Sequence, residues 1–186
     1  MQLNFDYWSI VAIAFLLSAL NSVAGAVRLQ SWPARLNQLL TALMALSLAT
    51  VALHLMPGGA VTAVGAVLLL AAAWFLLQCL PRRPEWARHQ HRGWLIYRAT
   101  QLALSYWIVT VFSVSAGKPG PPVHLLGSIL LSVYGGVLLV IAAVIWLLAT
   151  FATPRRDTSA QAVAKPQGLA EALVAGGLAF LLIAYA

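Results

Sequence analysis

Arg98, Gln101 and Ser105 are the residues of this chain whose types and spacing could do chemistry. They lie three and four residues apart, so they share one face of a helix. Their segment is apolar enough to cross a membrane. An arginine within a membrane span is by default a candidate functional residue. The set predicts contact with an anion, a quinone or a lipid headgroup. The alternative is that Arg98, one turn inside its segment, extends to the nearby membrane surface.

His54 and His124 form a second candidate site. The expected topology places both near the external ends of two apolar segments. Two neutral imidazoles at equal depth on facing helices are what a b-type haem with two histidine ligands requires. Haem b is therefore one alternative for this pair. The other is a structural role for His54, hydrogen bonded within a stripe that contains Thr50 and Ser47.

The acidic residues favour no catalytic site. There are four of them, Asp6, Glu85, Asp157 and Glu171, and the expected spans place each one in a tail, in a loop or at a helix end. The usual carboxylate carriers of proton- or sodium-coupled transport are then missing. The sequence also has no glycine-rich phosphate loop and no Cys/His cluster at metal-binding spacing. We therefore expect no catalytic residues, no metal and no enzyme activity.

The elements that position these side chains are expected to be transmembrane helices. The composition is 62% hydrophobic and only 8% charged, against roughly 25% charged in soluble domains. About 20 apolar residues cross a bilayer as a helix, which satisfies its own backbone hydrogen bonds. The sequence thus predicts one integral membrane domain over residues 1–186, an all-α polytopic bundle. The expected spans are about 7–27, 36–56, 60–80, 94–116, 123–151 and 169–186. The last is short, so five spans are the alternative.

The basic residues predict how the bundle is oriented. All but one of the eleven Lys and Arg residues, Lys118, fall in or beside three segments. These segments contain Arg28 and Arg35; Arg82, Arg83, Arg88, Arg92 and Arg98; and Arg155, Arg156 and Lys165. Cytoplasmic flanks carry excess Lys and Arg, so we expect a cytoplasmic loop at 152–168 and both termini outside. The net charge of +7 then indicates contact with anionic lipid headgroups and not with nucleic acid.

Small residues at four-residue spacing predict where helices pack closely. Two such sets stand out: Ser18 with Ser22 and Asn21 with Gly25, and Ser128, Ser132 and Gly136. They do not distinguish packing within one chain from packing between copies. Arginine far outnumbers lysine and alanine is abundant, a composition that we interpret as bacterial. We therefore expect the cytoplasmic (inner) membrane.

Three functions follow from these patterns. The leading hypothesis is a non-catalytic accessory or assembly subunit of a larger membrane complex, with other membrane protein subunits or a second copy as partners. One alternative is a small channel or uncoupled transporter, in which three polar helix faces converge. Those faces are Ser18 with Asn21, Ser47 with Thr50 and His54, and Arg98 with Gln101 and Ser105. The other alternative is a redox subunit that binds b-type haem or quinone.

Overall fold

The computed structural model describes residues 7–80, 92–117, 126–152 and 164–184. Over these ranges the chain forms six helices and no strand, so the predicted all-α class is confirmed. The helices are α1 (Tyr7–Arg28), α2 (Trp32–Ala52), α3 (Gly58–Gln78), α4 (Arg92–Gly117), α5 (Leu126–Ala152) and α6 (Ala164–Ala184).

Three helices within the described ranges are long and apolar enough to cross a bilayer, namely α1, α2 and α3. In α5 and α6 the apolar stretches found are shorter, Ser132–Ile145 and Gly168–Ala184. A helix of about 20 residues is about 30 Å long, which matches the hydrocarbon thickness of a membrane. The described part of the chain is therefore compatible with an integral membrane protein.

The second helix begins and ends about four residues earlier than the sequence indicated. It begins after Ser31, because Pro33 in its first turn has a backbone dihedral angle already suited to a helix. It ends because His54 adopts a φ of 55°, in the left-handed region. There His54 N–H donates to Val51 O and Leu55 N–H donates to Thr50 O, at 3.0 and 2.9 Å. This pair of hydrogen bonds is a Schellman motif, with histidine in place of the usual glycine.

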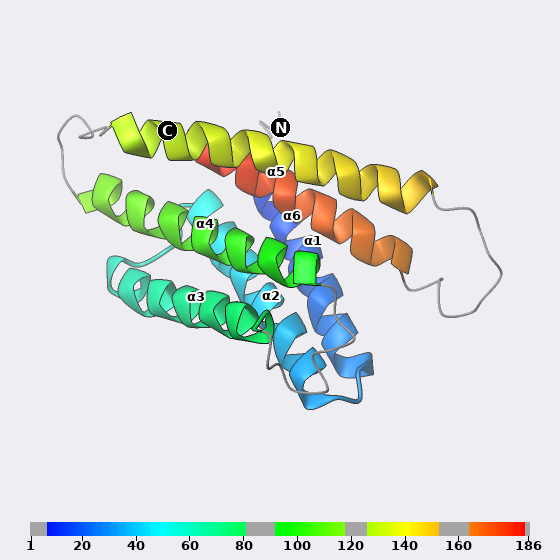
Figure 1. Ribbon diagram of the computed structural model, residues 1–186. Coiled ribbons are helices and arrows are strands. Elements are labelled where there is room, and N and C mark those ends of the chain that lie inside the picture. The colour runs from blue at the N-terminus through cyan, green and yellow to red at the C-terminus, as the bar shows by residue number, and fades with distance from the viewer. Residues whose placement is uncertain (1–6, 81–91, 118–125, 153–163, 185–186) are drawn as a thin grey trace, which may run out of the picture.

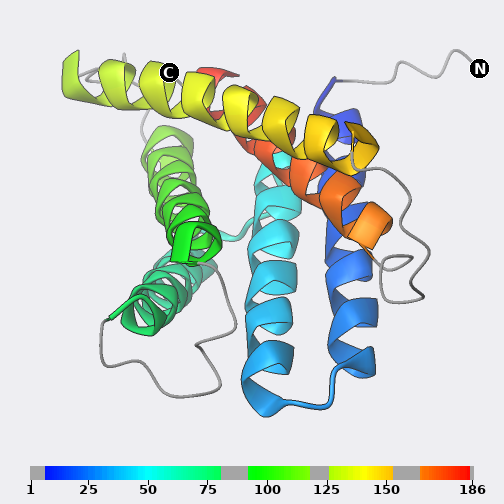
Figure 2. The same cartoon turned by 45° about the vertical axis from the view of Figure 1, so that its right-hand side comes forward.

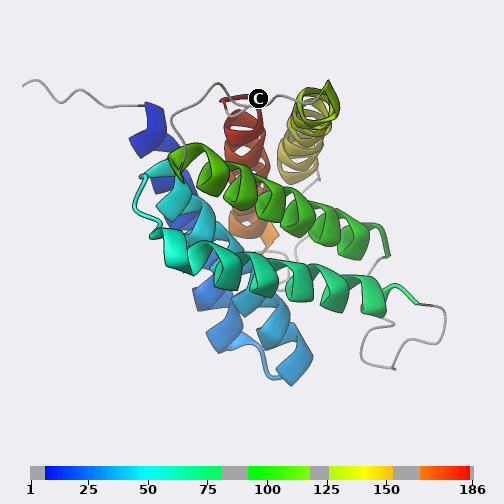
Figure 3. The same ribbon diagram turned by 90° about the vertical axis from the view of Figure 1, so that its left-hand side faces the viewer.

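The helices are arranged as three antiparallel hairpins. The hairpin of α1 and α2 stands upright in Figure 2, where α5 and α6 cross over its upper end. The third hairpin, α3 and α4, lies beside them, with its two helices side by side in Figure 3. Each hairpin connection contains, or is flanked by, residues of one of the three basic segments of the sequence. In Figure 1 the helix ends that border these connections are the right-hand or lower ends of their helices.

The last helix, α6, is the most enclosed of the six. It packs against α1 and α5 and also contacts α4. Its buried residues cover most of its circumference: Ala170, Glu171, Ala172, Val174, Ala175, Leu178, Ala179, Leu181 and Leu182. Against α1 the contact is so close that a Cβ at Gly177 would lie 2.9 Å from Cζ of the buried Phe15 ring. The short last segment, for which five spans were the alternative, therefore forms a helix that packs against several others.

Candidate functional site

The candidate site surrounds Arg98, near the start of α4. Its side chain is 3% exposed and is turned into the bundle, not toward a helix end. Its Nη1 donates to Gln101 Oε1 at 2.9 Å, and its Nη2 forms an ion pair with Glu171 Oε1 of α6. The guanidinium carbon also lies 5.3 Å from the centre of the Trp94 ring, within range of a cation–π interaction. Arg98 is therefore held on three sides by side chains of the protein.

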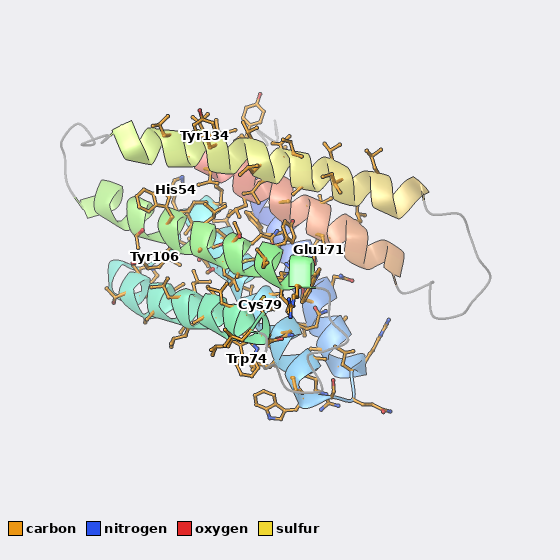
Figure 4. The ribbon with its side chains drawn as sticks, viewed as in Figure 1. His54, Trp74, Cys79, Tyr106, Tyr134 and Glu171 are labelled. Carbon is orange, nitrogen blue, oxygen red and sulfur yellow. The ribbon has the colours of Figure 1, made fainter. Side chains whose placement is uncertain are left out.

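Glu171 lies inside a helix, which corrects the sequence-based expectation that it opens the last helix. The helix begins at Ala164, about two turns earlier, and the Glu171 side chain is almost fully buried. The cytoplasmic loop expected over residues 152–168 hid the first turn of α6, which contains Pro166. Proline is well suited to a first helical turn, so the residue does not exclude a helix there. Figure 4 shows Glu171 close to the beginning of α4.

Gln101 and Ser105 have different roles in this cluster. Gln101 is fully buried, accepts from Arg98 and donates from Nε2 to the Tyr97 hydroxyl at 2.7 Å. Ser105 is also fully buried, but its hydroxyl donates to the Gln101 backbone carbonyl at 2.7 Å. Of the three residues that the sequence grouped, Arg98 and Gln101 are in direct contact. Ser105 shares their face and hydrogen bonds to its own helix.

Two buried polar atoms of this cluster have no hydrogen-bond partner among the described residues. They are Nε of Arg98 and Oε2 of Glu171. The two side chains carry opposite charges, so the pair is neutral. A buried ion pair is stable only when its remaining donors and acceptors are also satisfied. The Arg98–Glu171 pair is thus matched in charge and incomplete in hydrogen bonding.

A second buried polar cluster connects α2 to α3. Asn37 and Gln78 are each almost fully buried, and their amide groups exchange hydrogen bonds of 3.2 and 3.3 Å. The Trp74 indole donates to Asn37 Oδ1 at 2.9 Å. The sequence analysis missed this cluster, although an amide side chain in each of two consecutive apolar segments is a detectable signal. In contrast to the Arg98–Glu171 pair, these three side chains hydrogen bond one another.

In Figure 4 His54 lies well to the left of Glu171. Its ring is packed edge to face against Trp8 of α1, with ring centres 5.5 Å apart, and Trp8 packs in turn against Phe180. Ser47 and Thr50 hydrogen bond to backbone carbonyls of their own helix, at Met44 and Ser47. His124, the second predicted haem ligand, lies outside the described residues. The observed surroundings of His54 are those of a helix terminus packed on an aromatic ring.

Two of the predicted packing residues, Gly25 and Gly136, lie at contacts between hairpin partners. Ser18 and Ser22 are buried on α1, and a Cβ at Gly25 would lie 3.7 Å from the Gln38 side chain of α2. On α5, Ser132 is buried, and a Cβ at Gly136 would lie 3.1 Å from Ile183 of α6. The side chain of Ser128 lies outside the described part of the chain. The glycine contacts are within the molecule.

Comparison of the chain with protein-family models, with characterised proteins and with solved structures finds no match.

Proposed function

We propose that this chain is a six-span protein of the bacterial cytoplasmic membrane that acts as a non-catalytic accessory or assembly subunit of a larger membrane complex. In this arrangement the three basic hairpin connections face the cytoplasm and both termini lie outside, as the distribution of Lys and Arg favours. The connections also contact anionic lipid headgroups.

The observation that carries the proposal is the use of the buried polar side chains as contacts between helices. Arg98 and Glu171 connect α4 to α6, while Asn37 and Gln78 connect α2 to α3. Hydrogen bonds between helices stabilise membrane bundles because lipid offers no alternative partner. Buried polar side chains that connect helices in this way favour a structural role, as expected of an accessory or assembly subunit.

A polar path through the bundle has less support. The hydroxyl groups of Ser47, Thr50 and Ser105 each donate to a carbonyl of their own helix. They therefore contribute little hydrogen-bonding capacity to a passing solute. For this reason we rank the channel or uncoupled transporter below the subunit.

The outer side of α5 is the surface that we assign to the partner subunit. It carries a row of exposed apolar side chains: Val133, Tyr134, Val137, Leu138, Val140, Ile141, Val144, Ile145 and Leu148. Valine and isoleucine have few rotamers, so a face rich in them loses little side-chain entropy when a protein packs on it. Figure 1 shows α5 at the edge of the molecule, with α6 beneath it.

Photo-crosslinking in native membranes tests the proposal. A photoreactive amino acid replaces Leu138 on α5 or, as a control, Leu70 on α3, which are 65% and 70% exposed. We expect an adduct with a different membrane polypeptide from position 138 and none from position 70. Blue-native electrophoresis should then show both polypeptides in one complex. Adducts only with a second copy, or migration as a bare monomer, would contradict the accessory role.

A further inference from the structure

We infer that the Arg98–Glu171 pair is a binding site for a small organic monocarboxylate, which replaces the Glu171 carboxylate on Arg98 while Glu171 takes up one proton. This inference goes beyond the proposed function, because a structural ion pair needs no ligand. It rests on three features of the pair: its burial, its unused hydrogen-bonding atoms and its charge balance.

The guanidinium presents only part of its carboxylate-binding edge to Glu171. Arginine binds a carboxylate best with two parallel N–H donors, which contact both oxygens. Here Nη2 contacts Glu171 Oε1, while Nε and the second oxygen, Oε2, have no partner among the described residues. Gln101 accepts from Nη1, and Trp94 lies against the guanidinium. The Nε and Nη2 atoms therefore form the edge on which an incoming carboxylate would replace that of Glu171. A bound monocarboxylate that accepts from Nε and Nη2 would use this edge completely.

Charge limits the buried site to one anion at a time. Arg98 and Glu171 are each about 3% exposed, so neither charge is screened well by water. Two carboxylates around one guanidinium would leave a net negative charge in an apolar interior, which is strongly unfavourable. A second carboxylate therefore binds only when Glu171 is protonated and neutral. The released Oε2 of Glu171 is a suitable place for that proton, because no hydrogen bond from the described residues occupies it.

The exchange balances in atoms and in charge. The ion pair between Arg98 and Glu171 opens, the incoming carboxylate forms the new ion pair with Arg98, and one proton from water binds the Glu171 carboxylate. No bond to carbon forms or breaks, and the site stays neutral. A dicarboxylate would add a second charge without a partner, so the site should select monocarboxylates.

Arg98 is the charged group in contact with Glu171 within the described residues, and Tyr97 is linked to Arg98 through Gln101. The other titratable residues on α6 and on the helices that contact it, among those whose side chains the structure describes, are Tyr7, Arg28, Arg35, Arg92, Tyr106 and Tyr134. Tyr7, Arg28, Arg35, Arg92 and Tyr134 are exposed, and Tyr106 packs near Gly65 of α3. Proton uptake on ligand binding is therefore assigned to Glu171.

Calorimetry on the full-length protein in detergent tests the inference, with acetate as the probe and acetamide as the uncharged control. Titrations in two buffers of different ionisation enthalpy give the number of protons taken up. For the wild type we expect one proton per acetate bound, and an affinity that falls about tenfold for each unit of rising pH. Acetamide should not bind. Acetate binding without proton uptake, or no acetate binding at any pH between 5 and 8, would overturn the inference.

Two variants assign the effect to the pair. Glu171→Gln should bind acetate at least tenfold more tightly at pH 7, with no proton uptake and no pH dependence. Arg98→Gln should lose acetate binding. If a variant is unstable, melting curves with and without acetate replace calorimetry. Acetate should raise the melting temperature of Glu171→Gln more than that of the wild type. It should not change the melting temperature of the double variant Arg98→Gln/Glu171→Gln. Equal shifts in all three proteins overturn the inference. The crosslinking result at Leu138 is independent of these outcomes.

Discussion

Helices α5 and α6 are partners in one hairpin and have opposite environments. Both are apolar, yet α6 is enclosed by α1, α4 and α5, while α5 packs mainly on α6. The side chains of α6 that make these contacts are mostly small, such as Ala175 and Gly177, and α5 exposes large ones, such as Ile141 and Leu138. In a bilayer, small residues let helix backbones approach, and large apolar residues suit lipid equally well. Residue size therefore distinguishes the inner helix from the outer one better than hydrophobicity does.

The difference between the two helices extends to charge, since α6 carries the carboxylate of Glu171 and the sequence of α5 contains no acidic residue. Glu171→Ala should remove the partner of Arg98 and leave a guanidinium charge buried, so the free energy of unfolding should fall by about 3–5 kcal/mol. Unfolding by a denaturing detergent in mixed micelles measures this value. The double variant Arg98→Met/Glu171→Leu removes both charges and should recover most of the loss. A double variant no more stable than Glu171→Ala would mean that the charge is not the cause.

A leucine-to-alanine pair compares the two helices directly. Leu178 on α6 is fully buried, and Leu138 on α5 is exposed. Leu178→Ala should lower the free energy of unfolding by about 2–5 kcal/mol, because it leaves a cavity between helices. Leu138→Ala should change it by no more than about 0.5 kcal/mol. The same mixed-micelle unfolding measures both variants, and similar losses would remove the distinction between inner and outer helix.

Adjacent glycines provide a finer test on α6. A Cβ at Gly177 would lie 2.9 Å from the Phe15 ring. A Cβ at Gly176 would have no atom within 4 Å, apart from its chain neighbours and the nearby backbone of its own helix. Gly177→Ala should destabilise the protein by about 1–3 kcal/mol through overpacking. Gly176→Ala should be neutral or stabilising by up to about 1 kcal/mol, because alanine favours helix. Thermal unfolding in detergent compares the two variants. Phe15→Leu should make Gly177→Ala less harmful, and a failure to do so would place the clash elsewhere.

The sequence predicted the helices well, because an apolar stretch of about 20 residues has the length that a helix needs to cross the hydrocarbon core of a membrane. It predicted the cluster around Arg98 only in part. Gln101 was found from its spacing, but Glu171 lies 73 residues away from Arg98, and helix periodicity carries no information about contacts at that separation. The cluster of Asn37 and Gln78, 41 residues apart, was missed for the same reason.

The sequence also did not predict two helix ends, the start of α6 and the end of α2. The sequence predicted a loop over residues 152–168, while the structure begins α6 at Ala164. At the end of α2 a histidine takes the left-handed conformation that usually marks glycine, and no sequence pattern indicates that choice. Helix ends depend on a few backbone hydrogen bonds, which hydropathy does not detect.

The contact of α5 with α6 should tolerate more change than the contact of α6 with α1. A Cβ at Gly136 would lie 3.1 Å from Ile183 Cγ1, a distance that requires the isoleucine to move by a few tenths of an ångström. Ile183 is 56% exposed, so it has room to do so, unlike the buried Phe15. Gly136→Ala should therefore stay within about 1 kcal/mol of the wild type, since the gain in helix propensity offsets the closer contact. The same thermal unfolding, with Gly136→Ala/Ile183→Ala as the relieved control, measures the difference. A loss as large as that of Gly177→Ala would show that the outer helix is packed as rigidly as the inner one.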